Sequence, residues 1–178
     1  MTENLETFYS FLISLLPFSF VIAAIGLIIA MLTRLFKNDM VKVIGIALFI
    51  QTFILGILLI IVQNMVVKNV RSEVIGILSD PKIKISIDSA DFGSLQTEEL
   101  KNELLKLKDI STNHSHAMDK KAIQVISPAG NFNIFIARDS NNPKEFWIFT
   151  NRYKSGEDKE IGKIKTSNIV LDNVNRSE

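Results

Sequence analysis

The residues whose types and spacing could carry chemistry are few in this chain of 178 residues. His114 and His116 flank Ser115, so on an extended strand both imidazoles would point to the same side. With Asp109 or Asp119 they could hold a divalent metal, and such a site could hydrolyse a cyclic nucleotide. The alternative is a pair of solvated histidines in a polar loop.

Other catalytic motifs are absent from the sequence. It contains no glycine-rich dinucleotide fingerprint, no P-loop, no Gly-x-Ser-x-Gly elbow, no His-Glu-x-x-His and no cysteine. We therefore predict a protein without enzymatic activity, without a cofactor and without a bound metal.

Basic and aromatic residues are frequent between residues 119 and 165. This segment contains nine Lys and Arg and six Asp and Glu. Arg138 follows Phe135, and Arg152 lies between Phe149 and Tyr153. A guanidinium offers a planar fork for phosphate, and an aromatic ring offers a face for a nucleobase. The pattern predicts an anionic nucleotide pocket, with ordinary surface salt bridges as the alternative. The predicted ligand-binding residues are Arg138, Arg152 and Lys154 for phosphate, His116 and Asn113 for base or ribose, and Trp147 or Tyr153 for stacking.

Alternating apolar residues predict the strands that would position these side chains. Ile83, Ile85 and Ile87 would share one face of the first strand. The run Phe-Trp-Ile-Phe at residues 146–149 is apolar on both faces, which is typical of a central strand. The expected strands are residues 82–88, 121–127, 132–138, 144–153 and, with less regular alternation, 160–165.

One main helix is expected between the first two strands. Thr97 suits the N-cap position, and two glutamates follow it, where carboxylates interact favourably with the helix dipole. Leu100, Leu104 and Leu107 form an apolar stripe, and the helix should end near Lys108. The prediction is an α+β domain with a mostly antiparallel sheet.

Charge is distributed unevenly along the chain, since 31 of 39 charged residues lie in residues 72–178. Residues 7–33 and 43–67 carry no charge, and each exceeds the roughly 20 residues that cross a bilayer core. We predict a hairpin of two transmembrane helices over residues 1–71, followed by one soluble domain. The net charge of +1 disfavours direct binding of DNA or RNA duplexes.

Polar residues within the second predicted span suggest how it associates. Gln51 and Thr52 lie near its middle, and a glutamine in hydrocarbon usually finds a partner across a helix interface. They predict an oligomer seam or a pore lining, with a hydrogen bond inside the hairpin as the alternative. This helix is expected to continue to about Leu78, before Ser79, Asp80 and Pro81 break it.

Charge leaves the orientation in the membrane open. The loop between the spans carries Arg34, Lys37 and Lys42, which by the positive-inside rule places it in the cytoplasm and the C-terminal domain outside. At least as many basic residues follow the second span, beginning with Lys68 and Arg71, and they favour the opposite orientation.

The layout of the whole chain resembles a known family. The helical hairpin at residues 7–67, the polar segment with His114 and His116, and the strand at residues 146–152 resemble the small membrane effectors of type III CRISPR systems that sense cyclic tetra-adenylate. The resemblance implies a homotetramer in the bacterial inner membrane, with a cytosolic C-terminal domain. Binding of the messenger there would rearrange the helices and open a pore or disrupt the membrane in antiphage defence.

Two functions follow as hypotheses. The first is a ligand-gated membrane effector whose soluble domain binds a cyclic oligoadenylate, with cyclic tetra-adenylate as the first choice. The alternative is a membrane-anchored structural or regulatory subunit whose soluble domain faces outward and binds a protein partner.

Overall fold

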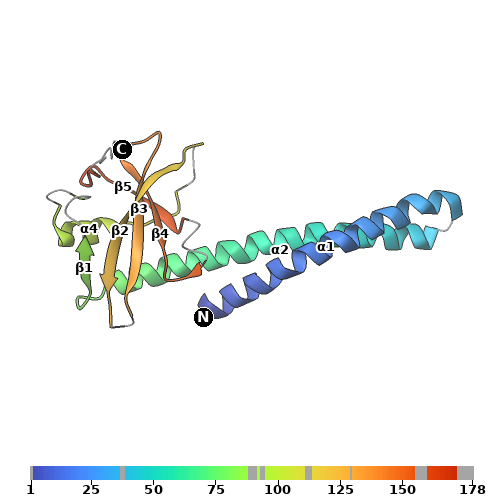
Figure 1. Ribbon diagram of the computed structural model, residues 1–178, viewed down its shortest axis with the longest axis horizontal. Helices are drawn as coiled ribbons and strands as arrows, with labels where there is room; N and C mark the ends of the chain where they lie inside the picture. The colour runs from blue at the N-terminus through green and yellow to red at the C-terminus, as the bar shows by residue number, and fades with distance from the viewer. Residues whose placement is uncertain are drawn as a thin grey trace, which may run out of the picture. The chain divides into compact units, whose positions relative to one another are not determined.

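The computed structural model describes residues 2–36, 39–87, 92, 95–110, 114–128, 130–154 and 160–171. The chain divides into two compact units, Met1–Val66 and Val67–Glu178. Helix α2 contributes to both, because it runs over Asp39–Leu78 (Figure 1). The sequence-based boundary after residue 71 therefore falls a few residues inside the second unit.

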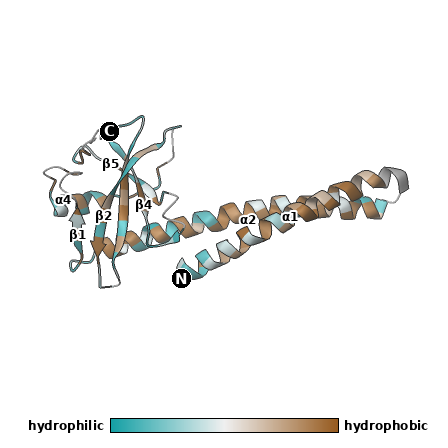
Figure 2. Ribbon diagram, in the orientation of Figure 1, coloured by the Kyte–Doolittle hydropathy of each residue, from teal (hydrophilic) through white to brown (hydrophobic). Residues whose placement is uncertain are grey.

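Two long apolar helices make up the first unit, α1 over Thr2–Phe36 and the first part of α2. Both are long and apolar enough to cross a membrane, and apolar residues line most of their length (Figure 2). Many of their apolar side chains point outward, and Phe18 is 67% exposed. Such a surface is favourable only against other apolar groups, as the two predicted spans would require.

The two helices of this unit approach each other closely at two glycines. A Cβ atom added to Gly26 would lie 2.7 Å from the carbonyl oxygen of Gly45, and one added to Gly45 would lie 2.7 Å from the nitrogen of Ala30. The contact is backbone against backbone, which only glycine permits. Gly56, also on α2, has open space in the direction of its absent side chain.

Polar side chains link the same two helices. Thr52 Oγ1 lies 2.8 Å from Ser19 Oγ and donates to the Ser19 carbonyl at 2.9 Å. Gln51 Nε2 donates to that carbonyl at 3.2 Å, and Tyr9 donates to Gln63 Oε1 at 3.1 Å. Gln51 and Thr52, the residues predicted at an oligomer seam or pore, are thus hydrogen-bonded within the hairpin.

The second unit contains an antiparallel five-stranded sheet, which confirms the expected α+β arrangement (Figure 1). The strands follow one another in the sheet in the order of the sequence, so each pairs with its chain neighbour. The elements are β1 (Lys84–Ile87), α4 (Thr97–Leu104), β2 (Ala117–Ile126), β3 (Phe132–Asp139), β4 (Glu145–Thr150) and β5 (Gly162–Lys165).

The helix α4 is shorter than expected and begins differently. Gln96 is its N-cap and makes no side-chain capping bond, so the assignment of Thr97 as N-cap was wrong. The helix ends at Leu104 because the next turn tightens, with Lys106 and Leu107 each bonding the carbonyl three residues earlier. Lys108 then pairs with Lys163 of β5, which draws the chain away from a helical path.

The core of this unit includes the end of α2. Val70, Val74 and Leu78 are almost fully buried there, as are Leu100 and Leu104 of α4. On the sheet, the central isoleucines of β2, β3 and β4 are likewise buried. Strand β4 is paired on both edges and buried on both faces, as its apolar sequence predicted.

Candidate functional site

The two arginines predicted to bind phosphate lie at opposite ends of the sheet. Arg138, at the end of β3, is opposite Phe146 at the start of β4. Arg152 follows the far end of β4, and its guanidinium lies 5.2 Å from the ring centre of Phe132. Arg138 lies six positions along the strand from Phe132, which corresponds to about 20 Å at roughly 3.3 Å per residue. The two guanidinium groups therefore cannot hold one phosphate.

Arg152 and Tyr153 are engaged by a carboxylate from α2. Arg152 Nη2 lies 3.1 Å from Glu73 Oε1, and the Tyr153 hydroxyl donates to the same carboxylate at 2.6 Å. Burial and the neighbouring Glu73 together raise the pKa of Tyr153 above its ordinary value, so the hydroxyl stays protonated and remains a donor. These two predicted ligand-binding residues therefore connect α2 to the segment that follows β4.

Trp147 belongs to a buried polar cluster on the opposite face of the sheet from the isoleucines. Its Nε1 donates to Asp139 Oδ2 at 2.8 Å, and Lys163 Nζ lies 3.7 Å from its ring centre. Lys163 also pairs with Asp139 at 3.3 Å, and Ser115 donates to the same carboxylate. Burial alone would raise the pKa of Asp139, but these hydrogen bonds hold it well below its ordinary value.

The remaining predicted residues are dispersed. His116 has an exposed side chain, and its backbone pairs with Ser140, while His114 adopts a left-handed φ of 51°. Lys154 is exposed, and Asn113 lies outside the described residues. Among the residues that the structure describes, no three His, Asp or Glu side chains gather as a metal site would require.

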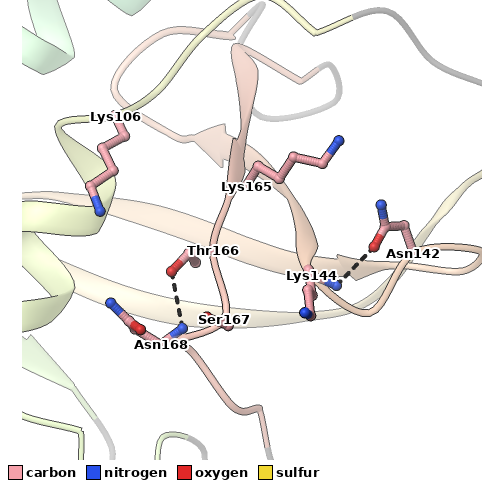
Figure 3. A pocket seen from close by; sticks show the side chains of 7 residues that line it. All are labelled: Lys106, Asn142, Lys144, Lys165, Thr166, Ser167 and Asn168. Carbon is pink, nitrogen blue, oxygen red and sulfur yellow. Dashed lines mark hydrogen bonds between the residues drawn. The ribbon is translucent and has the colours of Figure 1, made fainter.

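A cavity of about 430 Å³ brings together a different set of basic residues (Figure 3). Lys106 approaches from the segment after α4, Lys144 from the turn between β3 and β4, and Lys165 from the end of β5. We call this cavity the lysine pocket. It is lined by Lys106, Asn142, Lys144, Lys165, Thr166, Ser167 and Asn168.

Two carboxylates hold two of the three ammonium groups of the lysine pocket. Lys165 Nζ lies 2.6 Å from Glu145 Oε1, and Lys106 Nζ lies 2.8 Å from Glu103 Oε1. Lys144 is exposed and has no ion-pair partner within the part of the chain that the structure describes. Three cations against two anions leave a positive excess that an anionic ligand would neutralise.

Hydrogen bonds fix the turn that carries Lys144. Asp139 Oδ1 accepts from the backbone nitrogens of Asn141 and Asn142 at 2.9 and 3.0 Å. Asn142 Oδ1 accepts from the backbone nitrogen of Lys144 at 3.1 Å, and its amide donates to Glu145 at 3.2 Å. The buried carboxylate of Asp139 thus shapes the rim of the lysine pocket.

The pocket combines charge with donors suited to oxyanions. Ammonium groups bind phosphate oxygens as point charges, and the hydroxyls of Thr166 and Ser167 can add neutral hydrogen bonds. Lys144 and Lys165 belong to the basic run recognised in the sequence, but neither was predicted to bind ligand. Lys106 lies about 40 residues before Lys144 in the sequence. Its position beside the pocket could be predicted only from the order of the strands in the sheet.

We expect Glu103 to stabilise this region at neutral pH but not in strong acid. Burial raises its pKa, and hydrogen bonds led by Lys106 outweigh burial and lower it below the ordinary 4.5. A lowered pKa in the folded state gives stability above the unfolded pKa that is lost as pH falls through the folded value. The stability deficit of Glu103→Gln should therefore be constant above about pH 5.5 and shrink in acid.

Glu160 provides a control, because its pKa is shifted in the direction opposite to that of Glu103. Burial and nearby carboxylates raise its pKa, so its charged form opposes folding. Glu160→Gln should increase stability at neutral pH, and the gain should vanish as pH falls below 4.5. Urea unfolding of the full chain in detergent, repeated across this pH range, measures both; a constant Glu103→Gln deficit down to strong acid would contradict the assignment.

Comparison with known proteins does not assign the chain to a family. No family model, no curated protein and no solved structure matches the chain.

Proposed function

We propose that this protein is a ligand-gated membrane effector that binds an anionic, phosphate-bearing ligand in the lysine pocket. The observation that carries the proposal is that three lysines from three separate segments line one pocket. Glu145 and Glu103 neutralise Lys165 and Lys106, and an anion bound in the pocket would neutralise the remaining positive charge of Lys144. Cyclic oligoadenylates, with cyclic tetra-adenylate first, are the ligands that the resemblance of the layout suggests.

The two apolar helices supply the membrane part of the proposal. They are long enough to span a bilayer, and their outward-facing side chains are those that lipid would solvate. We place the protein in the bacterial inner membrane as a homotetramer with a cytosolic C-terminal domain, where it acts in antiphage defence. Its role there is to bind and respond, without enzymatic activity.

Calorimetric titration of the full chain in lipid nanodiscs tests the binding step. We expect saturable heat with cyclic tetra-adenylate and little with adenosine, which has the base and ribose but no phosphate. Inorganic pyrophosphate should compete weakly, because it offers charge without the ring. Absence of heat and of thermal shift with every cyclic oligoadenylate would exclude these ligands.

Removal of single lysines should weaken this binding. Lys144→Met and Lys165→Met should each raise the Kd of cyclic tetra-adenylate by about tenfold, which corresponds to about 1.4 kcal/mol. Lys84→Met is the matched control, because it removes the same charge from an exposed position on β1, at the other edge of the sheet. Equal losses in all three variants would indicate general charge attraction rather than a site.

The orientation in the membrane separates this proposal from that of an outward-facing regulatory subunit. We expect a C-terminal alkaline phosphatase fusion to be inactive and a C-terminal green fluorescent protein fusion to be bright. The basic loop between the helices favours the opposite result. An active phosphatase fusion would contradict a cytosolic messenger and support the partner-binding alternative.

A further inference from the structure

Two neighbouring strands connect the lysine pocket to α2. Strand β4 begins beside Lys144 of the pocket, and the chain that follows it reaches Glu73 of α2. Strand β5 runs the other way, from a contact with Arg71 of α2 to Lys165 of the pocket. Because the two strands are antiparallel partners, both connections span the same part of the sheet.

The contact of β5 with α2 is made through its backbone. Arg71 Nε donates to the carbonyl oxygen of Ile161 at 2.5 Å, and its Nη1 lies 3.2 Å from Asp109 Oδ2. Gly162 lets the arginine approach, because a Cβ there would lie 3.0 Å from Arg71 Nε and 2.6 Å from the Lys108 carbonyl. The position of β5 is therefore tied directly to this arginine.

The contact of β4 with α2 is made through side chains. Glu73 receives the guanidinium of Arg152 and the hydroxyl of Tyr153, as described above. Arg71 and Glu73 lie two residues apart on α2 and carry opposite charges. We call these two residues the clamp.

Strand β5 pairs with β4 along one edge and is bridged to Lys108 at one residue, Lys163, on the other. Trp147 pairs with Lys163 on the β4 side, and Lys108 exchanges two backbone hydrogen bonds with Lys163 on the other side, at 2.9 and 3.0 Å. Gly162, Lys163 and Ile164 are all buried. Because this short strand is buried and close-packed, a shift at Lys165 would be transmitted along it to Ile161.

We infer that the clamp formed by Arg71 and Glu73 is the route by which occupancy of the lysine pocket reaches α2. The inference rests on the proposed function, because it assigns the regulation of that same site. A ligand that draws Lys165 or Lys144 inward would compete with the Lys165–Glu145 pair and shift the ends of β4 and β5. The clamp would pass that shift to the last turns of α2.

Hydrogen exchange of the amides in residues 71–78, measured on the full chain in nanodiscs, tests the clamp. Two perturbations are applied at the pocket, addition of cyclic tetra-adenylate and the ligand-free substitution Lys165→Glu. Each should change exchange in this part of α2 by about fivefold or more, the usual lower range of allosteric coupling. In the double variant Arg71→Gln with Glu73→Gln, both responses should be lost while the Kd for cyclic tetra-adenylate changes less than about threefold.

Matched variants separate coupling from loss of structure. Lys68→Gln removes a charge from an exposed position on the same helix and should leave both responses intact. Tyr153→Phe removes one bond to Glu73 without changing side-chain volume, and should reduce the response even if the double variant fails to fold.

The outcomes distinguish the clamp from the ligand. No heat with cyclic tetra-adenylate, but a response to Lys165→Glu that the clamp variants abolish, supports the clamp and rejects the ligand. Binding without any response in α2, or equal responses in wild type and Tyr153→Phe, overturns the clamp and leaves the binding site standing.

Discussion

Lys163→Met is expected to destabilise the second unit by about 3–5 kcal/mol, the cost of removing one partner from a buried ion pair. Lys163 is 0% exposed and Asp139 is 2% exposed, so neither charge has solvent as a substitute partner. The substitution would leave the carboxylate of Asp139 buried among neutral donors and would also remove the cation above the ring of Trp147. Urea unfolding of the full chain measures the loss, and Trp147, the only tryptophan, reports on this unit.

The neighbouring lysine on β5 provides the control. Lys165 is 60% exposed and pairs with Glu145, so Lys165→Met should cost no more than about 1 kcal/mol. The double variant Asp139→Asn with Lys163→Met should recover part of the loss, because it leaves no unpaired charge. A Lys163→Met variant as stable as Lys165→Met would show that the pair is not needed for folding.

Gly26→Ala and Gly45→Ala should each weaken the helical hairpin by about 1–3 kcal/mol, the usual cost of overpacking. The added methyl group would meet backbone atoms of the facing helix at 2.7 Å, and backbone cannot rotate away as a side chain can. Gly56→Ala, on α2 in open space, should be neutral or slightly stabilising, because alanine favours a helix.

Labels at the open end of the hairpin measure this effect. The chain contains no cysteine, so Ser10→Cys and Asn64→Cys introduce the only two thiols. They lie next to the hydrogen-bonded pair Tyr9 and Gln63, so energy transfer between attached dyes should fall when the helices separate. Titration with SDS should separate them earlier in Gly26→Ala than in Gly56→Ala; coincident transitions would contradict the close packing.

The fold could be predicted from the sequence because its signals are local. Alternating isoleucines and the doubly apolar run at 146–149 identified the strands, and charge-free stretches identified the long helices. One error, the predicted end of α4, lies where distant residues decide the local structure. The end of α4 depends on the pairing of Lys108 with Lys163, which no local pattern records.

The site was harder to predict for the same reason. Arg152 and Tyr153 have the composition of a phosphate and base site, but Glu73, about 80 residues earlier, engages both. The lysine pocket joins Lys106, Lys144 and Lys165 only because β4 and β5 are antiparallel and the segment after α4 lies beside them. The sequence indicated an excess of basic over acidic residues only between residues 119 and 165, and the topology determines which lysines lie close together.

An anion bound in the lysine pocket is proposed to change the state of the two apolar helices. Leakage of a small trapped dye from liposomes that contain the full chain measures this change. Reconstitution inserts chains in both orientations, so ligand added outside reaches those whose soluble unit faces the bath. We expect cyclic tetra-adenylate to release the dye from wild-type liposomes, and the double variant Lys144→Met with Lys165→Met to remain sealed at the same concentration. Sealed wild-type liposomes under conditions where calorimetry shows bound ligand, or equal leakage with and without the two lysines, would contradict the claim.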